Sequence, residues 1–565
     1  MSGSWNVSVV QQLFVALATR DKRVREQTLE YIVRKLEEWT KEPKAAFDRL
    51  NELVDSDHRF YDVAHGNCVP KLLDHLPYLL MLSIQCPFTD VREKCTLILE
   101  ILQLMGILAS IHLKLSTHNK GVKVPKPVSI GPSSFIPTKE VLSPYSDNPE
   151  IQLLFIEAFL QNNRLDHITQ VIGHHPHYLE LFLRTQHFIL KGDGPLPYDY
   201  RHYIAIMAAA RHRCTTLVNL QKQEFLLQQG NERWLQGLDY IPQKLKDLAE
   251  INKILAHQPW LINRTHIEKL TKGKDNWSLS EVVHAIVILA HFHSLCSFIF
   301  GSGVSAEIDQ EEGHTFQPIN ISDNGAIEVD GCENSHVTYE KESSVEEIMQ
   351  KMRYILEQRT QKPNKEERMK CFERVESQNA ELPAGVDYCS SLTTDLTRFM
   401  DDPDFTYQDF ARRGEVSEIS TFRIQDYSWD DHGYSLVNRL YNDVGVLLDE
   451  KFKKAYNLTY NTMGVKNNVD TSMFRRAIWN YIQCIYGIRH DDYDYREVNE
   501  LLERNLKTFI KTVCCYPNRT TKSQYDSVMK GFKHSEKVHV NLMMLEARMQ
   551  AELLYALRAI THYMT

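Results

Sequence analysis

One cysteine near the middle of the chain has the neighbours of a reactive thiol. Cys214 follows an Arg-His-Arg run in IAIMAAARHRCTTLVNLQKQEF, residues 204–225, whose apolar spacing predicts one helix. Arg211, one turn earlier, is a cation that could lower the pKa of the thiol. The same spacing also places Cys214 in an apolar stripe, and no Cys-x-x-Cys pair supplies a resolving thiol. Two interpretations stay open: a working thiol and a small buried residue.

Two adjacent arginines lie on a helix predicted over residues 469–488, VDTSMFRRAIWNYIQCIYGI. Helical spacing puts Arg476 on a polar face and Arg475 on an apolar face with Ile478 and Trp479. A buried guanidinium needs a carboxylate. Arg475 therefore belongs either to a structural ion pair or to a site for a ligand that carries the carboxylate.

The complementary charge could come from Glu536, in the first turn of the final predicted helix. An acid is favoured there by the helix dipole, so Glu536 is either a solvated first-turn residue or the anion of the same site. One fixed cation, one fixed anion and an apolar wall would suit a free amino acid. Thr459 and Thr462 could place hydroxyls over that site, although sequence spacing alone does not bring these segments together.

One acidic segment and one histidine-rich segment are weaker indications of a partner-docking surface and of a metal site. Asp491, Asp492 and Asp494 precede a basic helix and form either a solvated patch or a partner-docking surface. The histidines of GHHPHYLELF, residues 173–182, lack the i, i+4 spacing of a helical zinc site. We therefore expect no metal and no other cofactor.

Charge and composition exclude several classes of protein. The 565 residues carry a net charge of −9, which argues against general nucleic-acid binding. The start MSGSWNVSVV is not a signal peptide, and the apolar stretches LPYLLMLSI and ILEILQLMGILASI are shorter than the ~20 residues of a membrane span. The 11 cysteines form no disulfide framework. We expect an intracellular protein without a membrane span, located in the cytoplasm and also in the nucleus.

Apolar residues recur at helical spacing along most of the chain, so the predicted fold class is all-α. An N-terminal helical extension with a Pro-rich connection occupies residues 1–148, and a compact helical half follows at 149–302. Residues 303–400 are acidic and poor in large apolar residues. This composition predicts a largely disordered linker, interrupted by one charged helix at about 344–374. A second helical half, with the candidate pocket, occupies 401–565.

Long strings in both halves resemble the sestrin family, among them DGPLPYDYRHYIAIMAAARHRC, RRAIWNYIQCIYGIRHDDYDY and FKHSEKVHVNLMMLEARMQAELLYALRAITHYMT. The resemblance implies two similar helical halves related to bacterial alkylhydroperoxidase-like domains. It also implies a stress-responsive negative regulator of TOR complex one that binds the GATOR-two complex, with AMP-activated kinase as a further partner. In one vertebrate sestrin, leucine occupies the C-terminal half and releases GATOR-two.

The resemblance also implies roles for single residues. Arg475 matches the arginine that holds the leucine carboxylate, and Glu536 matches the acid that holds its amine. His175 matches a histidine of the first half that closes toward the ligand. Asp491 and Asp492 match the aspartates that dock the partner. The residues that match the lid over the ligand, or lie beside it, are Thr459, Tyr460, Thr462, Asp470 and Thr471.

The sequence departs from the family pattern at both candidate sites. Phe474 and Met529 stand where the leucine-binding member has leucine and tryptophan, so the pocket wall changes shape. One methylene alters selectivity by about 1–3 kcal/mol. Cys214 matches the proposed hydroperoxide-reducing cysteine, but its proton-relay positions hold Thr216 and Gln221, which cannot transfer protons in the same way.

Three hypotheses follow about what the protein does. The leading one is a non-catalytic, amino-acid-responsive inhibitor of TOR signalling that acts on GATOR-two. The second is a constitutive inhibitor with the same partner and no physiological ligand. The third is a weak alkyl hydroperoxide reductase with an antioxidant role, in which Cys214 is the catalytic residue.

Overall fold

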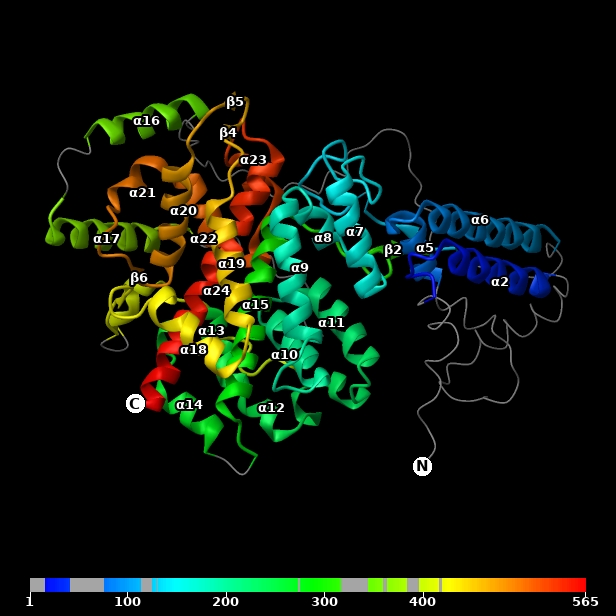
Figure 1. Ribbon diagram of the computed structural model, residues 1–565, viewed down its shortest axis with the longest axis horizontal. Coiled ribbons are helices and arrows are strands. Elements are labelled where there is room, and N and C mark those ends of the chain that lie inside the picture. The colour runs from blue at the N-terminus through cyan, green and yellow to red at the C-terminus, as the bar shows by residue number, and fades with distance from the viewer. Residues whose placement is uncertain are drawn as a thin grey trace. The chain divides into compact units, whose positions relative to one another are not determined.

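The computed structural model describes residues 16–40, 76–112, 124–129, 131–272, 275–316, 344–358, 363–383, 396–415 and 419–565. These residues are mostly helical, and the strands among them are two-residue pairs (Figure 1). The predicted all-α class is confirmed. The chain divides into two compact units, and each unit is assembled from three separate stretches of sequence.

The first unit comprises residues 1–132, 141–173 and 305–333. Arg25 and Asp90 join two of its helices through an ion pair of 2.9 Å. The strands β1 (Lys126–Pro127) and β2 (His314–Thr315) pair antiparallel. The helices among the described residues of this unit are α2 (Lys22–Thr40), α5 (Leu76–Gln85), α6 (Thr89–His112), α7 (Pro149–Asn162) and α8 (His167–Ile172).

The beginning of the predicted disordered linker is part of the first unit. Glu307 is fully buried and accepts a hydrogen bond of 2.8 Å from the backbone N–H of His167. Asp309 forms an ion pair of 2.5 Å with Arg164. The prediction of disorder is therefore wrong for residues 305–316, because these acids meet donors that lie far away in the sequence. Residues 317–343, 359–362 and 384–395 of the predicted linker lie outside the described residues.

The charged helix predicted near 344–374 is two helices, α16 (Val345–Gln358) and α17 (Lys365–Ala380). The second begins at a capping box in which Asn364 and Glu367 exchange side-chain-to-backbone hydrogen bonds. Pro363 directly precedes that cap, and a proline interrupts the backbone hydrogen bonding of a continuous helix. The prediction of a single helix is corrected by these local signals.

The second unit comprises residues 133–140, 174–304 and 334–565. Its core contains α15 (Leu279–Gly301) and α24 (His534–Met564), which pack against each other and are buried along most of their length. Helix α24 is the final helix expected from the sequence. Since α15 comes from the first predicted half and α24 from the second, elements of both halves share one core. This division differs from the boundaries predicted at residues 148, 302 and 400.

Other helices surround these two in the second unit. Its strands form a parallel pair, β3 (Phe422–Arg423) with β6 (Ile488–Arg489), and a hairpin, β4 (Thr462–Met463) with β5 (Lys466–Asn467). The surrounding helices include α9 (Pro176–Lys191), α10 (Tyr198–Arg211), α11 (Thr215–Leu227), α12 (Gln243–Asp247), α13 (Ala249–His257), α14 (Arg264–Thr271), α18 (Tyr434–Leu440), α19 (Val444–Asn457), α20 (Ser472–Ile485), α21 (Arg496–Leu501), α22 (Arg504–Cys515) and α23 (Lys522–Ser527).

Helix α15 is apolar on all its faces, and its most apolar 18-residue stretch is completely buried inside the fold. By length and composition it is the one helix in the described part of the chain that could cross a membrane. Core helices of soluble proteins pass the same test, since full burial requires apolar residues on every face.

The helix predicted over residues 204–225 is interrupted. Helix α10 ends at Arg211 and α11 begins at Thr215, with Cys214 at the junction. Arg213 takes a left-handed backbone conformation with φ of 55°, and Cys214 N–H bonds the carbonyl of Ala209 at 3.1 Å. The break lets α11 fold back against α10. Neither glycine nor proline marks this turn, so the sequence spacing did not predict it.

A buried charge network holds α24 to its neighbours. Arg548, on α24, is fully buried and donates to the Glu552 carboxylate at 2.9 Å and to the Ser297 hydroxyl at 2.8 Å. Another guanidinium nitrogen of Arg548 donates a hydrogen bond of 2.6 Å to Nε2 of the His212 ring. Glu552 also accepts from His293 at 2.8 Å. Because Ser297 and His293 lie on α15 and His212 follows α10, this network fixes how three helices meet.

Removing one charge of this network is expected to destabilise the second unit. Arg548→Met leaves the Glu552 carboxylate buried without its cation, which costs about 3–5 kcal/mol. The double variant Arg548→Met/Glu552→Leu should be less destabilised than the sum of the two single changes. Urea unfolding of all three variants measures this, with the exposed Arg439→Met as the control, expected within about 0.5 kcal/mol of wild type. If the two single changes in unfolding free energy add up to that of the double variant, Arg548 and Glu552 are not coupled.

Candidate amino-acid-binding site

Arg475, near the start of α20, turns its guanidinium into the core and is 9% exposed. It donates to the Tyr456 carbonyl oxygen and to the Thr471 hydroxyl at 3.1 Å. Burial lowers its pKa, against smaller opposing effects of Tyr456 and Asp470. No ion pair to Arg475 exists among the described residues, whereas its neighbour Arg476 pairs with Glu497 at 3.0 Å. The predicted inward orientation is confirmed, and the carboxylate that would balance Arg475 is not provided by the described protein.

Glu536 lies in the first turn of α24 and is engaged rather than solvated. Its carboxylate accepts hydrogen bonds from the Thr462 hydroxyl at 3.1 Å and from the Gly464 N–H at 3.0 Å. The N–H of Lys533, at the cap of α24, donates to it at 2.8 Å. The β4–β5 hairpin is thereby attached to the beginning of α24 through one carboxylate.

The segment between α19 and α20 carries the predicted lid residues. Thr459 and Thr471 face each other with hydroxyl oxygens 3.5 Å apart, and Thr471 also accepts from Arg475. Asp470 accepts from the Ser472 N–H at 2.9 Å, which restrains the entry into α20. This single loop therefore contacts the candidate cation through Thr471 and, through Thr462, the candidate anion.

His175, at the start of α9, joins the lid to α24. Its Nε2–H donates to the Ser535 carbonyl at 2.7 Å, and its Nδ1 accepts from the Tyr460 hydroxyl at 3.0 Å. Burial, followed by the nearby His539, lowers the pKa of His175 to about 3. The ring is consequently neutral at pH 7, as this pair of hydrogen bonds requires. The predicted approach of His175 to the lid is present in the structure.

His539 belongs to the same cluster and was missed by the sequence reasoning. Its ring centroid lies 5.5 Å from that of His175, and its Nε2–H donates to the Ala455 carbonyl at 2.9 Å. Burial lowers its pKa to about 4, and the positive charge of Arg475 acts in the same direction. The spacing from Glu536, three residues along α24, is the signal that would have placed it on the same helix face.

The two altered wall positions have different surroundings. Phe474 is buried at 3% exposure, and its ring stacks against Phe532 with centroids 6.0 Å apart. Met529 is half-buried in the turn before α24 and has a φ of 52°, which is unusual for a side chain of its size. The backbone N–H of Phe532 bonds the carbonyl of Met529. Phe532 therefore connects the two positions.

The predicted docking aspartates differ in exposure. Asp491 accepts from Arg423 and from Arg489, each at 2.7 Å, and these arginines hold the pKa of its carboxyl below the usual value despite partial burial. Asp492 is exposed and forms no ion pair in the described chain. Of the three acids predicted to form a solvated patch or a docking surface, Asp491 joins β3 to β6 through its two arginines, and Asp494 pairs with Arg496 at 2.6 Å. Asp492 is the exposed one without an ion pair among the described residues.

The candidate redox site is enclosed. Cys214 is 1% exposed and lies near the thiol of Cys296, whose pKa is raised well above its usual value first by burial and then by Cys214. Arg211 directs its guanidinium to backbone carbonyls, including that of Phe405 at 2.7 Å, rather than to a thiolate. The side-chain oxygen of Gln221 accepts a hydrogen bond of 2.8 Å from Nδ1–H of the His202 ring, and Thr216 is buried. Among the described residues no group of three or more His, Cys, Asp or Glu side chains could hold a metal ion.

The amino-acid sequence matches a known protein family. The family described as PA26 p53-induced protein (sestrin) matches residues 131–564. Sestrin-1 of Macaca fascicularis is 52% identical over 459 residues, covering 79% of this chain and 93% of that protein. Sestrin-2 of Homo sapiens is 50% identical over 440 residues, covering 77% and 91%. A sestrin homolog of Drosophila melanogaster is 50% identical over 463 residues, covering 71% and 93%. The chain belongs to the sestrin family.

The lowered pKa of His175 predicts a pH dependence. The unfolded chain takes up a proton below about pH 6.5, whereas the folded chain does so only near pH 3, so acidification favours unfolding. Relative to His175→Gln, the wild type should lose about 2 kcal/mol of unfolding free energy between pH 7 and pH 5. Urea unfolding at both pH values measures the difference. The exposed His432→Gln is the control and should show no such loss. If the difference in unfolding free energy between the wild type and His175→Gln is the same at both pH values, the fold does not lower the pKa of His175.

The burial of Cys214 predicts low reactivity. In the native protein iodoacetamide should modify the half-buried Cys371 and leave Cys214 unmodified until denaturant is added, because a thiol must be accessible and ionised to react. Peptide mass spectrometry reads out each position.

With cumene hydroperoxide we expect no turnover that depends on Cys214. Native modification of Cys214, with turnover lost in Cys214→Ser, would establish a reductase instead.

Proposed function

We propose that this protein is a stress-responsive negative regulator of TOR complex one, acting in the cytoplasm by binding the GATOR-two complex. We further propose that leucine, or a related apolar amino acid, controls this binding through Arg475 and Glu536. The observation that carries the ligand proposal is the buried Arg475 guanidinium, which has no ion pair among the described residues. A buried cation of this kind favours a carboxylate from outside the protein.

The proposed ligand would place each of its groups on a matching side chain. Its carboxylate would bind Arg475, and its ammonium would bind Glu536. Its apolar side chain would lie toward Phe474, which is buried and aromatic. The neutral rings of His175 and His539 add no charge that would compete for either end of a zwitterion.

The lid offers a route from ligand to partner. Glu536 holds the β4–β5 hairpin through Thr462 and Gly464, so an ammonium bound to Glu536 competes with these donors. A ligand shifts a conformational equilibrium only by its differential affinity for the two states. Rearrangement of the lid would supply that difference, and the exposed Asp492 is the proposed partner contact.

A constitutive inhibitor without a ligand is the second candidate. It is favoured by Glu536, whose carboxylate already accepts from three donors and so is satisfied without an amine. The hydroperoxide reductase is not favoured, because Cys214 is enclosed and Arg211 is engaged elsewhere.

Calorimetric titration with leucine separates these candidates. We expect binding to the wild type and a loss of about 10- to 100-fold in affinity in Arg475→Gln and in Glu536→Gln, since each removes one charge-assisted hydrogen bond. Glutamine at 536 can keep the capping box, so the start of α24 should stay intact. The exposed Arg439→Gln serves as the control for loss of an arginine.

A pull-down of GATOR-two with and without leucine completes the test. Release by leucine in the wild type, but not in Arg475→Gln, supports the sensor. Absence of leucine heat together with retained GATOR-two binding supports the constitutive inhibitor. If neither leucine nor GATOR-two binds to the folded chain, both forms of the proposal are wrong.

A further inference from the structure

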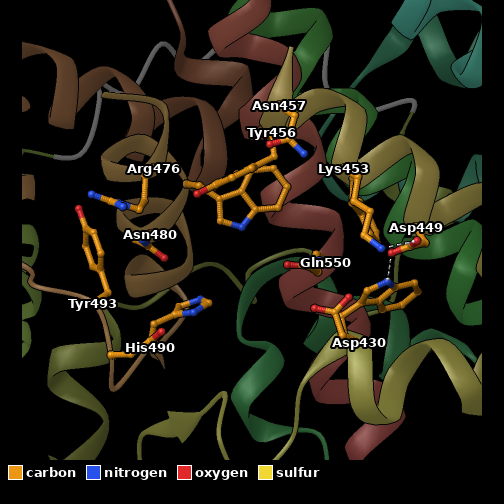
Figure 2. Close-up of a pocket in the computed structure, with 14 residues that line it drawn as sticks. Asp430, Asp449, Lys453, Tyr456, Asn457, Arg476, Asn480, His490, Tyr493 and Gln550 are labelled. Atoms are coloured by element: carbon orange, nitrogen blue, oxygen red, sulfur yellow. Dashed lines mark hydrogen bonds and ion pairs between the residues drawn. The ribbon is translucent and has the colours of Figure 1, made fainter. Parts of the chain in front are cut away.

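A cavity of about 360 Å³ borders α20 through Arg476, Trp479 and Asn480 and has no assigned role (Figure 2). It is lined from the segment before α18, from α19 and α20, from the loop after β6 and from α24. None of Arg475, Glu536 and His175 lines it. Its volume is within the range of small-molecule sites.

Both cations at this cavity are already paired. Lys453 binds the Asp449 carboxylate at 2.9 Å, and Arg476 binds Glu497 at 3.0 Å. His490 is neutral, since burial lowers its pKa to about 4. Two lining carboxylates, Asp430 and Asp492, form no ion pair among the described residues. The cavity therefore carries uncompensated negative charge.

These two acids approach the cavity from different directions. Figure 2 shows Asp430 beside Asp449 and Lys453 at one side, whereas Arg476, Tyr493 and His490 lie at the other. Asp492 is two residues beyond His490 in the loop after β6. One carboxylate thus belongs to each side.

Aromatic rings form a wall of the cavity. Trp429 packs edge-on against Phe452 with centroids 5.0 Å apart, and Tyr456 packs edge-on against Trp479 at 5.3 Å. All four residues line the cavity. Aromatic faces bind both methylene groups and organic cations.

A buried amide without a partner points to a ligand independently of the acids. Asn480 is 6% exposed and lines the cavity, and its side chain forms no hydrogen bond among the described residues. In Figure 2 its amide is directed toward the middle of the cavity. The amide is therefore available to a molecule in the cavity, and an amide oxygen accepts from an N–H donor.

We propose that this cavity binds a linear diamine or polyamine cation, with an ammonium near each of Asp430 and Asp492 and its methylene chain against the aromatic wall. Asn480 accepts a hydrogen bond from one of the ammonium groups. A monoamine would neutralise only one of the two acids. An anion is disfavoured because Lys453 and Arg476 are already paired.

Calorimetric titration of the full chain with 1,4-diaminobutane and spermidine tests the proposal, with butylamine as the monoamine comparison. We expect heat of binding for both polyamines at concentrations up to about 1 mM and at least about fivefold weaker binding of butylamine. Asp430→Asn and Asp492→Asn should each weaken binding of 1,4-diaminobutane by about two- to fivefold, and the double variant by more. Asp404→Asn, an exposed acid that does not line the cavity, should change it less than twofold.

Independent outcomes separate this site from the amino-acid site. Glu536→Gln should leave polyamine binding unchanged, whatever it does to leucine. Equal affinity for butylamine and 1,4-diaminobutane, or no effect of the double variant, would overturn the proposal, as would the absence of heat from a protein whose thermal melting shows that it is folded. Tighter binding of arginine than of the polyamines would assign the cavity to an amino acid instead.

Discussion

The arrangement of the second unit depends on the charges buried along α24. Glu546, Arg548 and Glu552 are all fully enclosed. Unpaired, each would cost several kcal/mol, so the fold must bring partners to them. Lys451 on α19 pairs with Glu546 at 3.1 Å, and Tyr178 on α9 donates to the same carboxylate. These pairings fix the depth and rotation of α24 against its neighbours, and with them the position of Glu536 and His539 at its beginning.

Burial also sets the electrostatics of the candidate site. His175 and His539 are neutral because the surrounding protein excludes water, and each ring nitrogen that carries a proton has a carbonyl to receive it. Arg475 keeps its charge, since a guanidinium does not deprotonate at physiological pH. The site therefore presents one strong cation beside uncharged rings, a condition that favours a carboxylate over other groups.

Two different chemical environments border helix α20. Arg475 is held by a backbone carbonyl and a lid hydroxyl, which leaves its charge uncompensated by the described residues. Arg476, one residue later, is neutralised by Glu497 and borders a cavity with excess negative charge. The 100° step between consecutive helical residues is enough to place adjacent arginines in sites of opposite character.

The sequence by itself determined the all-α class, the existence of a final helix with Glu536 in its first turn, and the inward direction of Arg475, because these follow from helical periodicity. It also carried the family resemblance. Only the tertiary structure decided that the helix breaks before Cys214, that Glu307 and Asp309 are packed rather than disordered, and that Asp491 is held by two arginines. It likewise brought Thr462 to Glu536 and Tyr460 to His175. These outcomes depend on partners far apart in the chain, whose pairing is set by burial and by the need to satisfy polar groups, and no local pattern encodes them.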